Sequence, residues 1–319
     1  AFHGVLTQRL TENYPRGNKE LRGSFFNVHG PQDTMGWFSD HGVQLKTEDD
    51  GRVFPVSNSS ASIVDCLLNE AKRVGVSLQT GKVVSSTSVV GNGKFLLKVE
   101  KRTIDFVEHL EAKYVLVATG SSKQGYLIAT QLGHSIIDPM PSLFTFKIED
   151  AQLASLSGVG PMLVTHWGLS GPVILRLSAW GARMLLVDFV PGIHIQEVKG
   201  ILFHHKDQFA GLDGDVLWSS IPKSNLISIA LLLKQYSFKV VGKGQFKDEF
   251  VTAGGVPLSE ISLNTMESKK QPNLFFAGEV LNIDGVTGGF NFQNAWTGGY
   301  IAGTSIGTLA SSYLMREVS

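Results

Sequence analysis

Gly278 and Glu279 stand at the end of a short apolar run, residues 273–277, in the C-terminal part of the chain. Glycine has no side chain, so a ligand can lie directly against the backbone at such a position. The neighbouring carboxylate can accept hydrogen bonds from the hydroxyl groups of a sugar or ribityl chain. The pair therefore predicts a binding site for a hydroxyl-bearing ligand at the end of a strand.

Two further glycines, Gly288 and Gly289, precede an apolar segment, residues 291–314, that we expect to form one long buried helix. The first backbone N–H groups of a helix have no partner within it, and the helix dipole places partial positive charge there. Such a helix start can bind a phosphate or the electron-rich carbonyl edge of an isoalloxazine ring. The alternative interpretation is a glycine-rich turn that only leads into a packed helix.

A third candidate is the apolar run 114–118, which is followed by Thr119 and Gly120. A short continuous apolar run is typical of a strand that is buried on both faces of a parallel sheet. The glycine at its end again lets a bound group approach the backbone, although an ordinary strand end explains this motif equally well when it is taken alone.

The elements around these motifs are indicated by apolar spacing and by turn residues. We expect the first sixty residues to be rich in loops, and a helix to follow the serines of 57–62 and to end at Gly75. Cys66 lies inside this helix and is interpreted as a core residue rather than a reactive thiol. Strands are expected at 76–79, 83–90 and 95–100, with a hairpin turn at 91–93.

The middle of the chain has a different pattern of shorter elements, which we interpret as an inserted second domain. Expected strands lie at 143–148, 161–165 and 184–189, and expected helices lie at 170–179, 196–209 and 225–234.

Charge and cysteine content exclude several classes of function. Basic and acidic residues number 28 each, so the 319-residue chain has a formal net charge of zero, which argues against nucleic-acid and polybasic membrane binding. The single cysteine excludes an intramolecular disulfide and a cysteine-cluster metal site. His204 and His205 are adjacent and point apart on a helix, so we predict no metal there. The longest apolar run, 226–233, is too short to span a bilayer.

The strand-end motifs together resemble the flavoprotein fold that has two dinucleotide-binding parts. More closely, residues 51–55, 165–172, 251–256, 276–281 and 284–303 resemble the BaiN/RdsA family of NAD(P)/FAD-dependent oxidoreductases, the YhiN-like flavoproteins. The resemblance runs over nearly the whole chain, in order. It implies an α/β FAD-binding domain, with a parallel sheet, a β-hairpin layer and helices, interrupted by an inserted mixed α+β or β-barrel-like domain.

The implied domain bounds are 1–140 and 249–319 for the two parts of the FAD-binding domain and 141–248 for the insertion. Members of the family begin with a strand and a Gly-x-Gly-x-x-Gly motif, which this chain lacks, so we expect it to start just after that unit. FAD is therefore expected for the full-length protein, and its retention by these residues alone is left open. A soluble, intracellular protein is expected, with a plastid or mitochondrial location as the alternative if a targeting segment precedes Ala1.

The resemblance also implies roles for individual residues. Glu279 would contact the ribityl or pyrophosphate region, residues 288–291 would lie beside the isoalloxazine ring, and Val83 would present its backbone to adenine. Arg52 and His166 are the candidates for polar contacts with the substrate, and hence for catalysis. The implied cofactor-binding residues are Val83, Thr119, Gly120, Gly278, Glu279, Asp284, Gly285, Thr287, Gly288, Gly289, Phe290 and Asn291.

The expected function is a flavin-dependent oxidoreductase that passes a hydride from NAD(P)H through FAD to a small organic acceptor. The alternative is a truncated or cofactor-less relative that serves as a non-enzymatic binding scaffold. A third reading, flavin-dependent RNA modification, shares the fold class but calls for a basic face that the balanced charge does not predict. We expect a small-molecule substrate as the partner, with no nucleic acid and no membrane.

Overall fold

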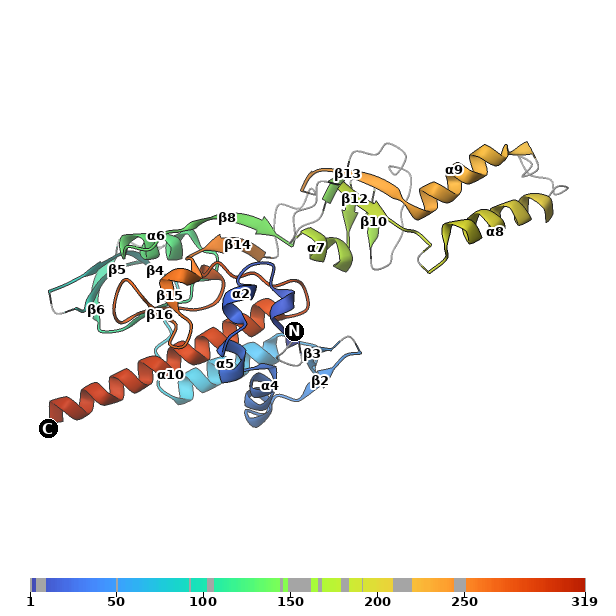
Figure 1. Cartoon of the computed structure of the whole chain (residues 1–319). Coiled ribbons are helices and arrows are strands. Elements are labelled where there is room, and N and C mark those ends of the chain that lie inside the picture. The colour runs from blue at the N-terminus through green and yellow to red at the C-terminus, as the bar shows by residue number, and fades with distance from the viewer. Residues whose placement is uncertain are drawn as a thin grey trace. The chain divides into compact units, whose positions relative to one another are not determined.

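The chain falls into two compact units, Ala1–Leu143 with Glu249–Ser319, and Phe144–Asp248 (Figure 1). The predicted bounds of the insertion, 141–248, lie close to those of the second unit, although its role as a separate domain stays a prediction. The computed structural model describes residues 2–3, 10–49, 51–91, 93–101, 106–143, 146–148, 162–165, 168–178, 184–190, 192–208, 220–243 and 251–318.

The N-terminal part of the first unit contains short helices and a small sheet. Its elements are β1 (Phe2–His3), η1 (Thr11–Asn13), α2 (Asn18–Leu21), α3 (Phe25–Val28), α4 (Pro31–Asp40), β2 (Leu45–Thr47) and β3 (Arg52–Pro55), with the strands in the antiparallel order β1-β3-β2. The segment expected to be rich in loops therefore also contains helices and short strands that were not predicted. Pro31 occupies the first turn of α4, and the Asp33 carboxylate accepts a hydrogen bond from the Gly30 N–H at 2.8 Å, so local helix-start signals were present.

The predicted amphipathic helix is confirmed as α5 (Ala61–Arg73). It ends in a glycine-based cap, because Gly75 has φ +81° and the Val76 N–H bonds the Ala71 carbonyl at 2.8 Å. Val76 is thus part of the helix end, and the strand expected at 76–79 does not form. Cys66 is half-buried in the cluster around Phe38, and burial raises the pKa of its thiol.

The hairpin layer is confirmed and carries one strand more than expected. Strands β4 (Lys82–Val89), β5 (Phe95–Lys101) and β6 (Val107–Ala112) form an antiparallel sheet in the order β4-β5-β6. Its main core contribution is Phe95, which is fully buried.

The sheet that positions the glycine motifs is mixed rather than all parallel. It contains β15 (Ile261–Ser262), β16 (Glu267–Ser268), β17 (Leu274–Phe276) and β7 (Val115–Val117), in the order β15-β16-β17-β7. Among the described strands, β7 and β17 form its parallel pair. Because β7 lies at the edge, Leu116 is exposed while Val117 is buried, which corrects the expectation of burial on both faces.

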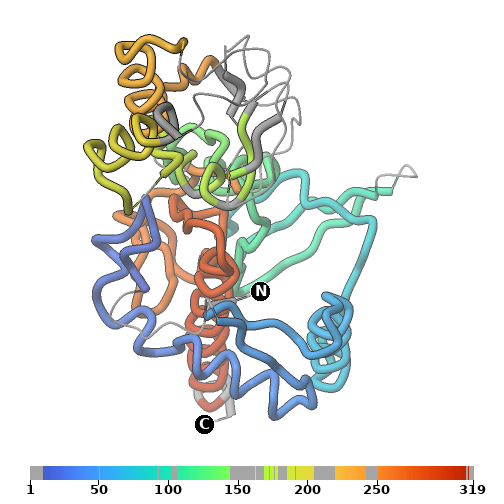
Figure 2. The backbone as a smooth tube through the Cα atoms, turned by 90° about the vertical axis from the view of Figure 1, so that its right-hand side faces the viewer, coloured from blue at the N-terminus to red at the C-terminus, as the bar shows by residue number. Residues whose placement is uncertain are grey.

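Two more pieces complete the first unit. After β7 come α6 (Lys123–Gln131) and β8 (Ile137–Ser142), which pairs with β14 (Val251–Gly255), and η4 (Leu258–Glu260) and η5 (Gly278–Val280) flank the mixed sheet. Helix α10 (Phe290–Val318) packs against β1, α3 and α4, so the C-terminal helix lies beside the N-terminal segment (Figure 2). Its buried residues lie between Phe290 and Ala302, where Phe292 and Tyr300 are nevertheless exposed, and most of the described side chains beyond Ala302 are exposed. The helix that was expected to be buried is therefore buried only in part.

The second unit contains an antiparallel sheet and three helices. Its strands are β9 (Phe146–Ile148), β10 (Leu163–Thr165), β11 (Gly168–Ser170), β12 (Met184–Val187) and β13 (Tyr236–Lys243), and its helices are α7 (Pro172–Ser178), α8 (Ile195–Gln208) and α9 (Lys223–Lys234). In the described part, the sheet order β10-β11-β9-β13-β12 leaves two edges, so these strands form an open sheet rather than a closed barrel. Leu169, Ile174, Leu185 and Phe238 form its core.

Candidate functional site

The parallel pair β7–β17 brings two of the predicted glycine motifs to the same edge of the sheet. Val115 is in register with Leu274 and Val117 with Phe276, and the Ala277 N–H donates to the Val117 carbonyl at 3.2 Å. Both strands therefore end together, with Thr119 and Gly120 following one and Gly278 and Glu279 the other. Ligands of open α/β sheets bind at such carboxyl ends.

The turn after β7 is packed tightly against the helix that follows it. Gly120 has φ +60°, and a side chain on Gly125 in α6 would collide with the side chain of Thr119. The Ser122 hydroxyl caps α6 by accepting a hydrogen bond from the Gln124 N–H at 3.2 Å. The strand, turn and helix thus form one fixed unit next to β17.

Glu279 is half-buried and has no hydrogen-bond partner among the residues that the structure describes. Gly278 before it has φ +76°, a left-handed conformation that favours glycine. Burial raises the pKa of the Glu279 carboxyl, and the Asp284 carboxylate raises it further. A half-buried acid without a protein partner is suited to accept hydrogen bonds from a ligand.

Asp284, in contrast, is held by the protein. It is fully buried, and its carboxylate accepts hydrogen bonds from the Arg16 guanidinium at 3.0 and 3.1 Å and from the Ser142 hydroxyl at 2.9 Å. Asp284 was predicted to bind the cofactor; these contacts give it a structural role that joins the N-terminal segment to the loop before α10.

Gly285, Phe290 and Asn291 are also engaged in that loop. A side chain on Gly285 would meet Phe290 Cβ at 2.7 Å. The Asn291 amide bonds both the N–H and the carbonyl of Gly285 at 2.7 Å, and the Tyr14 hydroxyl donates to the Phe290 carbonyl at 2.6 Å. These contacts set the shape of the loop, whatever ligand lies beside it.

Thr287, Gly288 and Gly289 form the turn that enters α10. Gly288 has φ +118° and Gly289 has φ +95°, so the turn needs glycine at both positions. Two glycines at this point leave no side chain over the start of a long helix, as the binding of an anionic or carbonyl group requires.

Two polar side chains inside α10 have unpartnered atoms. Gln293 donates to the Thr34 and Thr297 hydroxyls at 3.1 and 3.2 Å, but its Oε1 has no partner in the described part of the chain. Neither amide atom of the fully buried Asn294 has a partner there either. Buried polar groups are normally satisfied, so these two fit a polar ligand near the helix start. The three amide side chains of Asn291, Gln293 and Asn294 at the start of an otherwise apolar helix were the signal that could have predicted them.

Two of the remaining predicted residues, Val83 and Arg52, lie in other sheets. Val83 is half-buried in β4. Helix α6 contacts this strand, since Gln124 Nε2 donates to the carbonyl of Val84 at 2.5 Å. Arg52 lies in β3, pairs with the Glu48 carboxylate at 3.1 Å and covers the ring of Phe54. His166 lies outside the described residues.

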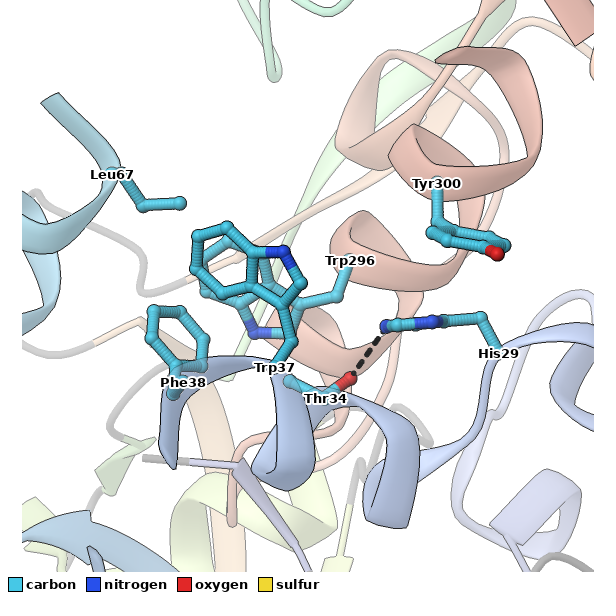
Figure 3. Close-up of a pocket in the computed structure, with 7 residues that line it drawn as sticks. All are labelled: His29, Thr34, Trp37, Phe38, Leu67, Trp296 and Tyr300. Carbon is cyan, nitrogen blue, oxygen red and sulfur yellow. Dashed lines mark hydrogen bonds between the residues drawn. The ribbon is translucent and has the colours of Figure 1, made fainter. Parts of the chain in front are cut away.

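An aromatic cavity of about 130 Å³ lies between α4, α5 and the middle turns of α10 (Figure 3). His29 and Tyr300 stack with ring centroids 4.4 Å apart, and His29 Nε2 lies 3.1 Å from the Thr34 hydroxyl. Burial lowers the pKa of His29, and Asp33 partly offsets this effect. None of the predicted site residues lines the cavity, and drug-sized ligand pockets usually exceed about 300 Å³, so we separate it from the strand-end site.

Two further observations concern the described residues alone. They contain no group of three or more His, Cys, Asp or Glu side chains arranged to hold a metal ion. In the same residues, no helix has both the length and the apolar character needed to cross a bilayer.

A parallel strand pair with glycine turns at its carboxyl ends, flanked by helices, defines a Rossmann-like α/β domain. The model of the HI0933-like protein Rossmann domain matches residues 3–305, and the chain belongs to this family. The resemblance to the BaiN/RdsA flavoproteins, drawn from the sequence motifs, is thereby confirmed.

Three curated relatives have the same degree of identity. The ribosomal RNA dihydrouridine synthase of Haemophilus influenzae is 26% identical over 324 residues, which cover 86% of this chain and 79% of that protein. The 3-dehydro-bile acid delta(4,6)-reductase of Clostridium scindens is 26% identical over 349 residues, covering 91% of this chain and 83% of that protein. The ribosomal RNA dihydrouridine synthase of Escherichia coli is 26% identical over 299 residues, covering 81% and 74%.

Proposed function

We propose that the protein is a flavin-dependent oxidoreductase that binds FAD at the carboxyl ends of β7 and β17. It would pass a hydride from NAD(P)H to an unsaturated small organic acceptor. The observation that carries the proposal is the parallel pairing of these strands, which gathers Thr119, Gly120, Gly278 and Glu279 at one edge. Family membership and the unpartnered polar groups of Asn294 and Glu279 support it.

The residues of this chain would bind and orient the cofactor, while the flavin supplies the hydride chemistry. Glu279 would accept hydrogen bonds from cofactor hydroxyls, and Gly288 and Gly289 would let the ring approach the start of α10. The helix start would stabilise negative charge there. Asp284 would act one step removed, by holding the loop through Arg16 and Ser142.

The acceptor class rests on the names of the relatives, one a bile acid reductase and two RNA dihydrouridine synthases. Both names point to substrates with an unsaturated ring. RNA modification is a second candidate because of the two synthases, although the zero net charge of this chain gives it no electrostatic support. The scaffold alternative is not favoured, because these relatives are named as enzymes.

An absorbance scan tests the proposal. The purified 319-residue chain, incubated with FAD and desalted, should show the bands of oxidised flavin, and anaerobic NADH or NADPH should bleach them. Glu279→Gln should retain less flavin than the matched surface variant Glu111→Gln. A chain that stays colourless after reconstitution would contradict the proposal.

A further inference from the structure

Tyr126 is a buried tyrosine whose hydroxyl is left without a partner. The residue is 8% exposed, and its hydroxyl has no hydrogen-bond partner in the part of the chain that the structure describes. Tyr14 of the same unit shows the usual arrangement, since its buried hydroxyl donates to the Phe290 carbonyl at 2.6 Å. Leaving a buried hydroxyl unsatisfied is unfavourable, and a bound ligand would supply the partner that the described residues do not.

Tyr126 is fixed in place on two sides. Gly125 before it lies directly against the Thr119 side chain, which holds α6 on the turn after β7. On the other side, the side-chain amide of Gln124 donates to the carbonyl of Val84 in the hairpin layer. These two contacts fix the start of α6, which carries Tyr126, beside the turn after β7.

Glu279 and Tyr126 belong to neighbouring strand ends. Strands β7 and β17 end in register, and Gly125 lies against Thr119 in the turn after β7, so the start of α6 and Glu279 lie at the same edge of the sheet. Burial raises the pKa of the Tyr126 phenol, and the Glu279 carboxylate raises it further, in agreement with this placement. No hydrogen bond joins them, so the described part of the site holds a buried donor and a half-buried acceptor, both unpartnered. A group that accepts from one and donates to the other would satisfy both.

We propose that Tyr126 and Glu279 together bind a sugar hydroxyl of the dinucleotide cofactor. The Tyr126 phenol would donate a hydrogen bond to the oxygen of that hydroxyl, and the hydroxyl would donate its own proton to the Glu279 carboxylate. This inference rests on the proposed function and adds Tyr126 to the binding residues. A hydroxyl both donates and accepts at one oxygen atom, so a single such group can satisfy both side chains. A phosphate oxygen in this position would face the Glu279 carboxylate, and like charges repel.

The sugar is either the ribityl chain of the flavin or a ribose, and four probes separate these sources. FAD contains both, riboflavin contains only ribityl, ADP-ribose contains only ribose, and lumiflavin has neither. Dissociation constants are measured for the full chain, for Tyr126→Phe and for the matched variant Tyr236→Phe in β13. Flavin fluorescence quenching reports the flavins, and thermal shift reports ADP-ribose.

For a ribityl site, Tyr126→Phe weakens FAD and riboflavin by about 2- to 10-fold, the loss of one hydrogen bond, and leaves lumiflavin unchanged. For a ribose site, Tyr126→Phe weakens the binding of FAD and ADP-ribose and leaves the binding of riboflavin unchanged. Tyr236→Phe changes none of them. In the ligand-free protein, Tyr126→Phe leaves the unfolding midpoint in urea unchanged or raises it, whereas a structural phenol would lower it.

Failure of the inference and failure of the proposed function give different results. If the wild-type chain binds FAD and Tyr126→Phe binds it equally, the inference is overturned and the function stands. If no flavin binds but ADP-ribose binds and depends on Tyr126, the function fails and the inference stands. If none of the probes binds the wild-type chain, both fail.

Discussion

Two glutamates of the first unit differ sharply in what surrounds them. The carboxylate of Glu260 accepts hydrogen bonds from Lys270 Nζ and His134 Nδ1 at 2.7 Å and from the Ser135 hydroxyl at 2.5 Å. Burial alone raises the pKa of Glu260, but these hydrogen bonds outweigh it and lower the pKa to about 2. Among the described residues Glu279 has no such partners, and the pKa of its carboxyl is raised.

The residues around Glu260 superficially suggest catalysis, because His134 Nε2 also lies 2.8 Å from the Ser268 hydroxyl. A nucleophilic serine needs a free oxygen, yet Ser268 Oγ accepts hydrogen bonds from the N–H groups of Lys270 and Gln271 at 3.0 and 2.8 Å. Ser268 is also buried. The arrangement therefore joins η4, α6 and β16 and stabilises the fold.

The comparison teaches that the number of hydrogen bonds a carboxylate accepts within the protein is a better guide to its role than the types of the residues around it. The hydrogen bonds of Glu260 support a structural role. Glu279 has no hydrogen-bond partner among the described residues, and our proposal is that a ligand supplies its partners. Each prediction below changes one side of this contrast.

The largest effect is expected for Glu260→Ala, which should lower the free energy of unfolding by about 3 kcal/mol because His134 and Ser135 lose their buried acceptor. Urea denaturation of the ligand-free chain measures it. Glu111→Ala, on the exposed β6, is the matched control and should cost about 0.5 kcal/mol or less. Equal costs for the two variants would refute the structural role of Glu260.

Glu279→Gln should show the reverse pattern. Flavin binding should weaken by about 10-fold or more, because a charged acceptor of hydroxyl groups is replaced by a neutral one. The ligand-free protein should be as stable as wild type or more so, since a half-buried, unpartnered charge is removed. Flavin fluorescence titration and urea denaturation measure the two quantities. A loss of stability without a loss of flavin binding would show that Glu279 has a structural role like that of Glu260.

The sequence alone predicted the strands and glycines next to Glu279, but it did not predict which carboxylate has hydrogen-bond partners within the fold. The apolar runs of β7 and β17 were recognised because a short continuous apolar run indicates a buried strand. The glycines after them indicated the candidate site. The helix α4 was missed although Pro31 and Asp33 marked its start. Local signals of that kind are weak beside a neighbouring turn-rich segment.

Partners far apart in the chain could not be predicted in the same way. The contact of Asp284 with Arg16, 268 residues away, gives it a structural role that its local sequence does not reveal, while its predicted cofactor contact stays a prediction. Tyr126 was not recognised because nothing in Gly125 and Tyr126 as a local pattern reveals an unpartnered hydroxyl. Which carboxylate is satisfied depends on tertiary contacts, and those come from the fold.

The pH dependence of stability should move in opposite directions for the two glutamates. The lowered pKa of Glu260 stabilises the fold above about 4.5, and this advantage over Glu260→Gln should be lost as pH falls toward about 2. The raised pKa of Glu279 favours the folded state at low pH. The free energy of unfolding of the wild type, relative to that of Glu279→Gln, should therefore increase as pH falls through the raised pKa of Glu279. It should decrease again as pH rises through that pKa.

Urea denaturation across this pH range, with each variant compared to wild type at every pH, measures both trends. For Glu279→Gln this comparison cancels the effect of His134, whose pKa is lowered chiefly by burial and which therefore adds its own loss of stability in acid. For Glu260→Gln the difference also includes His134, because the Glu260 carboxylate raises the pKa of His134 and the variant removes that effect. Parallel curves for the two variants would contradict the distinction.

The smallest effect is expected for Lys270→Ala, about 1 kcal/mol or less, although Lys270 forms an ion pair with Glu260 at 2.7 Å. The Lys270 side chain is 42% exposed, so water and salt screen the pair, while the His134 side chain is fully buried. Added salt should therefore reduce the cost of Lys270→Ala and leave the larger cost of His134→Ala nearly unchanged. If salt reduced both equally, Glu260 would be held mainly by charge rather than by buried hydrogen bonds, and it would no longer stand as the satisfied counterpart of Glu279.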